Sequence, residues 1–294
     1  MKFGQVEDPS QIDFTLPKDH PRTKEILAKN KSGLKDISIG CAKWNKTDLK
    51  GFYPKGTKDE LTYYATQFNS IELNATFYSL PSPEQILTWK EKTPADFKFF
   101  PKITNTVSHF RRLINVDDVV TNFSTSMLNF GDQLGMVFLQ LHDNFKPKDY
   151  DRVEKFVKSW PREVPLAIEL RSAEWFEEET FGKVTQLFEE NNITNIIVDT
   201  AGRRDMLHMR LTTDSAFIRY VGANAESDYE RLDDWLERIK IWKKEGLKNL
   251  YFFVHQNVEK ASPLLSAYFI EKLNSEFGTD IVIPKMAGGQ AALF

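Results

Sequence analysis

Eight short segments rich in β-branched and aromatic residues recur along the chain, and stretches with helical periodicity separate most of them. Strands that alternate with helices pair in parallel, because each crossover helix returns the chain to the starting edge of the sheet. The predicted strands are residues 36–43, 70–77, 96–103, 134–141, 165–172, 194–200, 215–221 and 249–256.

Two architectures accommodate this alternation, an open doubly wound sheet and a closed barrel. The strand count, a length of 294 residues and the lack of a glycine-rich dinucleotide fingerprint after the first strand all favour the barrel. We therefore predict an α/β fold with a single (β/α)8 TIM barrel over residues 36–284. A polar leader (1–35) with a short helix, N-capped by His20 and starting at Pro21, precedes it, and an extended tail (285–294) follows. The connection between Thr200 and Ser215 has no helical face and is predicted to be irregular.

Composition limits the functional classes. A formal net charge of -3 excludes a global basic field for indiscriminate nucleic-acid binding, although a local basic patch remains compatible with it. The single cysteine, Cys41, excludes an intrachain disulfide and a multi-cysteine zinc site, and it fits a reducing compartment. No apolar signal core or membrane-length apolar run is present, so the sequence predicts a soluble, cytoplasmic protein without a membrane partner.

Polar residues occupy alternate positions near the carboxyl ends of most predicted strands. In residues 70–77, Ile71 and Leu73 are expected to face the helices, which turns Glu72 and Asn74 toward the barrel axis. The same alternation directs inward Lys102, Gln140, Glu169, Arg171, Asp199, Arg219 and His255. Barrel enzymes place their active sites at this end, so a polar ligand site is predicted there; a purely structural ion-pair network is the alternative.

The runs "GCAKW", "IELNATFYSLPSPEQILTWKEKTPADFKFFPKI", "SHFRRL", "LGMVFLQL" and "IELRSAEWF" give the chain a family resemblance. From about Ile37 to the last helix it resembles the uncharacterised YecE-like family, domain of unknown function 72. The resemblance implies a TIM barrel and no established activity. The family pattern falls on Trp44, Glu72, Asn74, Phe77, Tyr78, Lys102, His109, Leu113, Gln140, Glu169, Arg171, Trp175 and Arg219.

The chain departs from the family pattern at the rim. Ser108 stands where the family usually has threonine, His142 and Asp143 replace prolines, and Ser172 replaces a common histidine. The family's Asn-Asn-His run is here "HQN" at 255–257, which adds Asn257 to the candidate rim residues. Other hydrogen-bonding groups thus replace the family's own.

The preferred hypothesis is an enzyme with hydrolase- or lyase-like acid-base chemistry that acts on a phosphorylated or otherwise anionic ligand, such as a nucleic-acid-derived one. A glutamate would be the acid or base. Arginine suits bidentate recognition of oxyanions, and rim aromatics can stack on a base or sugar. The predicted catalytic residues are Glu72, Glu169, His109 and Lys102. The predicted ligand-binding residues are Trp44, Asn74, Tyr78, Gln140, Arg171, Trp175, Asp199, Arg219, His255 and Asn257.

Two other chemistries stay open. A glycosidase would use Glu72 and Glu169 as acid and base, but neighbouring cations lower a carboxyl pKa and weaken the acid. A metal-dependent isomerase or endonuclease-like barrel would bind a single divalent metal through His109, His142, Asp199, His255 and the two glutamates. No HExxH spacing occurs, so no cofactor and no metal ligand is predicted.

The chain ends in "QAALF", which resembles the Q-x-x-L-F peptide that docks bacterial DNA-maintenance proteins into the replication sliding clamp. Gln290 would make a rim contact, and Leu293 and Phe294 would be the buried anchors. A non-catalytic nucleic-acid or partner-binding protein tethered by this tail is therefore the second functional hypothesis. Folding of Phe294 back onto the barrel, or simple disorder, would make the tail irrelevant to partners.

Overall fold

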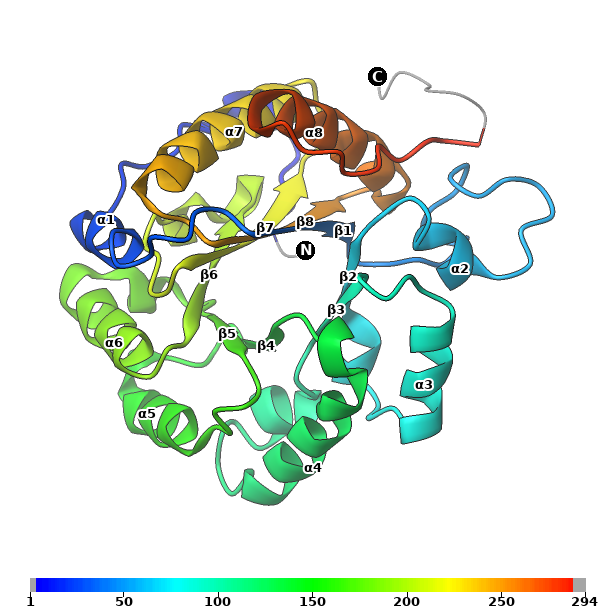
Figure 1. Cartoon of the computed structure of the whole chain (residues 1–294). Coiled ribbons are helices and arrows are strands. Elements are labelled where there is room, and N and C mark those ends of the chain that lie inside the picture. Colours follow the sequence, from blue (N-terminus) through cyan, green and yellow to red (C-terminus); the bar gives the residue numbers. More distant parts are fainter. Residues whose placement is uncertain (1–3, 288–294) are drawn as a thin grey trace.

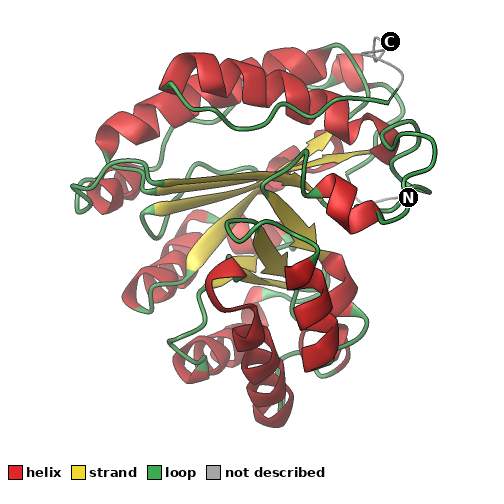
Figure 2. Cartoon of the chain, turned by 45° about the vertical axis from the view of Figure 1, so that its right-hand side comes forward, coloured by secondary structure: helices red, strands yellow, loops and turns green. Residues whose placement is uncertain are grey.

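The computed structural model describes residues 4–287 and has an α/β fold in which helices surround parallel strands (Figure 1). Six strands are β1 Asp36–Cys41, β4 Val137–Gln140, β5 Leu166–Glu169, β6 Thr194–Asp199, β7 Ser215–Gly222 and β8 Asn249–Gln256. They form one curled parallel sheet in the order β1-β8-β7-β6-β5-β4. Figure 2 shows helices outside the strands on both sides.

The other two strands, β2 Ser70–Leu73 and β3 Lys98–Pro101, pair with each other in a separate two-stranded sheet. Isolated bridges join the β3 segment to the β4 segment at Phe99–Leu134 and Lys102–Phe138. The predicted closed (β/α)8 barrel is therefore confirmed in part. The fold is α/β with a curled parallel six-stranded sheet, and the hydrogen-bonded ladder is interrupted on both sides of the β2–β3 pair. One reason is length: β2 stops at Leu73, because the predicted strand continues as a 3-10 turn over Asn74–Phe77.

Side chains join β1 to β2 where the ladder is missing. The Asn69 side chain accepts from the backbone N–H of Ile39 (2.9 Å) and donates to the carbonyl of Ile37 (2.7 Å). Gly40 lies so close to the next strand that an added Cβ would sit 2.2 Å from the Ser70 carbonyl oxygen. Glycine at position 40 therefore permits the close approach of the two backbones.

Replacing Gly40 with alanine is expected to lower the free energy of unfolding by ~1–3 kcal/mol, because the backbone of β1 or β2 must shift. Gly182→Ala is the matched control, since an added Cβ there meets no heavy atom within 4 Å. That helical substitution should stabilise the protein by ~0.5–1 kcal/mol. Urea unfolding measures both values, and equal effects of the two substitutions would contradict the close approach at Gly40.

The helices are α1 Pro21–Leu27, α2 Glu60–Tyr64, α3 Pro83–Glu91, α4 Asp117–Met127, α5 Tyr150–Ser159, α6 Glu178–Glu190, α7 Ser227–Glu245 and α8 Ser262–Phe277. The predicted N-cap of α1 is confirmed, since His20 accepts from the backbone N–H of Arg22 (3.2 Å) and Pro21 opens the helix. The irregular connection between β6 and β7 is also confirmed and contains the 3-10 segment Ala201–Met206. Among residues 4–287, no helix combines the length and the apolar character needed to cross a membrane.

A layer of aromatic side chains fills the space enclosed by the strands. Phe100, Phe138, Phe217 and Phe253 are fully buried, and the ring centroids of Phe100 and Phe253 lie 4.8 Å apart. Side chains two positions apart on a strand share a face, so the next inward position is two residues further on. Those next positions hold Lys102, Gln140, Arg219 and His255.

Candidate functional site

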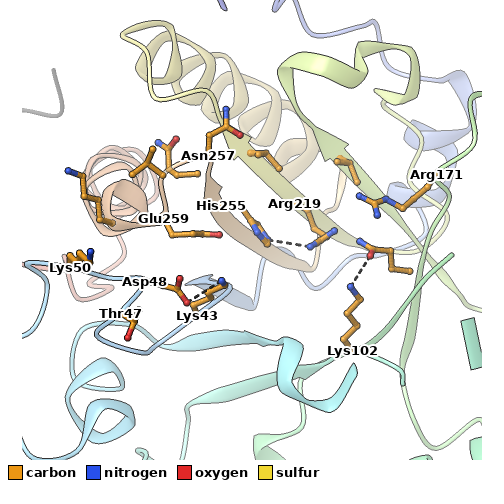
Figure 3. A pocket seen from close by; sticks show the side chains of 16 residues that line it. Lys43, Thr47, Asp48, Lys50, Lys102, Arg171, Arg219, His255, Asn257 and Glu259 are labelled. Atoms are coloured by element: carbon orange, nitrogen blue, oxygen red, sulfur yellow. Dashed lines mark hydrogen bonds and ion pairs between the residues drawn. The ribbon is translucent and has the colours of Figure 1, made fainter. Parts of the chain in front are cut away.

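Beyond the aromatic layer lies a second layer, made of polar side chains at the carboxyl ends of the strands (Figure 3). We call this set the polar layer; it comprises Glu72, Lys102, Gln140, Glu169, Arg171, Arg219 and His255. The structure brings together predicted residues that lie up to 183 positions apart in the chain. Their placement at one end fits the alternation in the sequence, while their functional roles remain predictions.

Arg219 of β7 is the centre of the polar layer. Its Nε and Nη2 donate to the two carboxylate oxygens of Glu72 at 2.8 and 2.9 Å, a bidentate pair. Its Nη1 donates to Glu169 Oε2 on the other side. Both glutamates are fully buried, and Arg219 is 8% exposed. One guanidinium therefore joins β2 and β5 across the interior, in the fork geometry that arginine offers to carboxylates.

Gln140 extends this network from Glu169 to Lys102. Its Nε2 donates to Glu169 Oε1 (2.9 Å), and its Oε1 accepts from Lys102 Nζ (2.8 Å). Arg171 Nε lies 3.1 Å from the same Glu169 Oε1, and Arg171 Nη1 lies 3.4 Å from Asp143 Oδ1. Oε1 of Glu169 thus faces Gln140 and Arg171, while its Oε2 accepts from Arg219.

Glu72 has two further partners. Asn74 donates from Nδ2 to Glu72 Oε1 (2.8 Å), and His255 Nε2 lies 2.9 Å from Glu72 Oε2. With Arg219, these contacts surround the carboxylate of Glu72, as a buried charge requires. Asn74 and His255, both predicted ligand residues, therefore act directly on Glu72.

Both glutamates are held in the ionised form. Burial by itself raises the pKa of Glu72, but Arg219 and His255 outweigh it and hold that pKa well below the usual range. Burial likewise raises the pKa of Glu169, and the charges of Arg219, Arg171 and Lys102 bring it below its usual value. Burial opposes the charge of Arg219 as well, yet the two glutamates raise its pKa. The network therefore gives neither glutamate a protonated form near neutral pH and makes both of them anchors for Arg219.

In Lys102, by contrast with the two glutamates, the surroundings disfavour the charged form. Burial, and then the positive charge of Arg219, lower its pKa to about 8. Its Nζ lies 4.2 Å from the centroid of the Phe77 ring, and the residue is 8% exposed. Lys102 can therefore exchange a proton near neutral pH.

His109 lies at the edge of the site, on the segment Thr106–Phe110 after β3. Its Nδ1 lies 2.8 Å from Ser108 Oγ, and its ring centroid is 5.0 Å from that of Phe77 and 4.9 Å from that of His142. Burial, with His142 and the nearby cations, lowers its pKa to about 4. His109 is therefore neutral at physiological pH.

A cavity of about 730 Å³ opens above the polar layer. Lys102, Gln140, Arg171, Arg219, His255 and Asn257 from the predicted set line it. Its wall carries six lysine or arginine side chains against two acidic ones, because Lys43, Lys50 and Lys260 join from loops while the acids are Asp48 and Glu259. This end of the molecule is locally basic although the whole chain carries a formal charge of -3.

Alternation in the sequence does not predict the three loop lysines or the two acids. Lys43 and Lys50 follow β1, and Lys260 follows β8; Lys43 Nζ pairs with Asp48 Oδ2 at 3.1 Å. Alternation ends where a strand ends, so it gives no orientation for loop residues. The usable signal was their position, since loops at the carboxyl ends of barrel strands carry function.

Asp199 is not part of the polar layer, and the prediction that it faces the interior is wrong. Its carboxylate accepts from Trp235 Nε1 (2.7 Å), lies 2.9 Å from Arg231 Nη2, and pairs with Arg204. Trp235 and Arg231 belong to α7, so Asp199 faces that helix. Its neighbour Val198 lines the cavity instead.

The predicted rim aromatics have separate positions. Trp175 is fully buried and donates to the Phe145 carbonyl (2.7 Å), so its predicted ligand contact is wrong. Trp44 is half-buried beside Trp89, with ring centroids 6.0 Å apart. Tyr78 is 77% exposed, and the centroid of its ring lies 5.1 Å from that of Phe77. A stacking role for Trp44 or Tyr78 stays a prediction.

Two further expectations concern metal and tail. Within residues 4–287, no group of three or more His, Cys, Asp or Glu side chains is arranged to hold a metal ion, and the donors named for a divalent metal do not converge. The tail residues Gln290, Leu293 and Phe294 lie outside the described residues. Docking to a sliding clamp therefore remains a prediction from sequence.

An α/β fold with a charged network and a cavity at the carboxyl ends of parallel strands defines the chain as a barrel-like protein with a polar mouth. The family model described as a protein of unknown function, DUF72, matches residues 38–287, and the chain belongs to this family.

Similar sequences and solved structures agree with this membership. The UPF0759 protein YecE of Escherichia coli strain K12 is 29% identical over 287 residues, which cover 88% of this chain and all of YecE. A DUF72 family protein of Thermotoga maritima is 27% identical, with a TM-score of 0.69 over 82% of this chain and all of that one. A DUF72 family protein of Enterococcus faecalis, at 19% identity and a TM-score of 0.69 over 87% of this chain and all of that one, shares the fold. The family resemblance seen in the sequence is thus confirmed.

Proposed function

We propose that the chain is an enzyme that binds a small phosphate- or carboxylate-bearing ligand in the cavity above the polar layer. The supporting observation is the charge imbalance of the cavity wall, six lysine or arginine side chains against two acids. The proposed enzyme is one (β/α)8 barrel in which the six-stranded sheet and the β2–β3 pair meet at two seams with sparse backbone pairing.

The buried charges below the cavity reduce this imbalance but do not reverse it. Adding the buried Glu72 and Glu169 to the two acids of the wall gives four negative charges against the same six cations. Arg219 is satisfied by the two glutamates, whereas Lys50 and Lys260 reach the cavity from loops. An oxyanion entering from solvent offers such cations charge-assisted hydrogen bonds.

The ion pairs also change which residue we expect to transfer a proton. The sequence predicts a glutamate as acid or base, but the charges around Glu72 and Glu169 favour an anchoring role for both. Lys102, whose pKa is lowered to about 8, is the better candidate for proton transfer. The proposed enzyme therefore centres on Lys102 rather than on a pair of carboxyl groups.

Replacing both Lys50 and Lys260 with glutamine is expected to weaken binding of inorganic phosphate and glycerol 3-phosphate at least ~10-fold. A charge-assisted hydrogen bond contributes ~1.5–3 kcal/mol, and 1.4 kcal/mol corresponds to a factor of ten. Isothermal titration calorimetry measures the dissociation constants.

The matched control is the double substitution Lys155→Gln and Lys244→Gln, which removes the same charge from exposed positions on α5 and α7. It should leave both dissociation constants within a factor of two, as expected for screened, distant charges. Absence of saturable binding to the unmodified protein, or equal losses in the two double variants, would refute the proposed anion site.

A further inference from the structure

We propose that Lys102 is a nucleophile that forms an imine with the carbonyl carbon of the ligand. The inference rests on the proposed anion site and narrows its substrate class to small anionic aldehydes and ketones. Lys102 would then be a catalytic residue that bonds covalently to the substrate.

The position of Lys102 suits this role. It follows β3 directly, lines the cavity, and is held at the polar layer by its hydrogen bond to Gln140 Oε1. Gln140 is in turn fixed through its Nε2 by Glu169, so the amide presents its oxygen to Lys102. The amine is therefore positioned by the network and open to the cavity.

Its surroundings distinguish Lys102 from the loop lysines. Lys102 is only 8% exposed, whereas the three loop lysines are exposed, and one of them, Lys43, pairs directly with Asp48. The Phe77 ring covers one side of its ammonium group. A lysine that is desolvated next to other cations is the form that proteins use for imine chemistry.

The electrostatic balance increases the share of the free amine relative to an ordinary lysine. Burial and Arg219 lower the pKa of Lys102, Arg171 adds to this, and Glu169 and Glu72 oppose it, with a result of about 8. At pH 7 about a tenth of the side chain is then neutral, against roughly one in three thousand for an ordinary lysine. The nucleophilic form is thus populated in the range where the protein must work.

The reaction balances without an external oxidant or reductant. The lone pair of neutral Nζ attacks the carbonyl carbon, and the C–N bond forms as the carbonyl π electrons move to oxygen. Proton transfer from nitrogen to oxygen gives a carbinolamine. Protonation of its hydroxyl releases water, and the nitrogen lone pair forms the C=N bond of the iminium ion. The cations of the cavity wall would hold the anionic group of the ligand during these steps.

Reductive trapping tests the inference. The protein is incubated at about pH 7 with glyceraldehyde 3-phosphate and borohydride, which converts an iminium ion to a stable secondary amine. Intact-mass and peptide analysis should find an adduct at Lys102 with the mass of the ligand less one oxygen atom, at least ~10-fold above any other lysine. Its formation rate should rise as the pH increases through about 8, because the neutral amine becomes more abundant.

Two variants and a matched ligand serve as controls. Lys102→Arg keeps the positive charge and should abolish the adduct, while an unchanged circular dichroism spectrum and urea midpoint show that the variant is folded. Lys98→Arg changes a lysine at the opposite end of β3 and should leave the adduct intact. Glycerol 3-phosphate, which lacks the carbonyl, should compete with adduct formation.

The outcomes separate the inference from the proposed function. Binding of both phosphate esters without an adduct, or with adducts spread evenly over surface lysines, would overturn the imine and leave the anion site standing. Absence of binding by either ester, together with no specific adduct, would overturn both. An adduct that persists in Lys102→Arg would also refute the inference.

Discussion

Replacing Arg219 with methionine is expected to lower the free energy of unfolding by ~3–5 kcal/mol at neutral pH. The substitution leaves two fully buried glutamates, Glu72 and Glu169, without the cation that joins them. An uncompensated buried charge costs far more than the intact pair contributes, so removal of this one partner has a large effect. Urea unfolding, followed by fluorescence, provides the measurement.

Arg152→Met is the matched control for this substitution. Arg152 pairs with Asp149 on the surface, with its side chain 38% exposed, and its loss should cost ~0–1 kcal/mol. A similarly small loss for Arg219→Met would contradict the view that the polar layer depends on one guanidinium.

The pH dependence of the same comparison follows from the lowered pKa values of the two glutamates. A carboxyl whose folded pKa is depressed contributes stability above its unfolded pKa of about 4.3, and this contribution is lost as the pH falls through the folded value. In Arg219→Met the glutamates lose their main cation, and protonation at low pH relieves their buried charge. The difference between the two proteins should therefore shrink as the pH falls from 7 toward about 3.

Replacing Asp199 with asparagine is expected to lower the free energy of unfolding by about 3 kcal/mol and to leave phosphate affinity unchanged. The stability loss arises because Arg231 and Arg204 lose a buried charge partner; it lies at the lower end of the range because Asp228 still pairs with Arg231. Binding is unaffected because the side chain faces α7 and not the cavity.

Glu169→Gln makes the same change of acid to amide on the neighbouring strand and should alter both stability and phosphate affinity. Calorimetric titration of the folded variants separates the two cases. A tenfold change in phosphate affinity in Asp199→Asn would return that residue to the site.

Most of the polar layer could be predicted from alternation, because side chains two positions apart on a strand share a face and the polar residues follow buried aromatic ones by two positions. Phe100 before Lys102 and Phe217 before Arg219 are examples. The sixth strand, "TNIIVD", is buried on both faces, so its continuous apolar run did not reveal which face Asp199 shares.

Two other failures have local causes. The predicted strand from 70 to 77 turns at Leu73, since a single alternating stretch does not show where the backbone changes to a 3-10 turn. The direction of the loop lysines around the cavity could not be predicted, because loop residues do not follow the two-residue alternation of a strand. The sequence also does not show which charged residues form ion pairs. Nothing in it indicates that Arg219 pairs with both Glu72 and Glu169.

Because the hydrogen-bonded ladder is interrupted, the polar layer also has a structural role. The β2–β3 pair lies between two seams where backbone pairing is sparse, and it supplies Glu72 and Lys102. The contacts of these side chains with Arg219 and Gln140 fasten that pair to the larger sheet. The hydrogen bonds that position Glu72 and Lys102 therefore also hold the β2–β3 pair against the larger sheet. A substitution that changes the chemistry at either residue would also change the stability of the two seams.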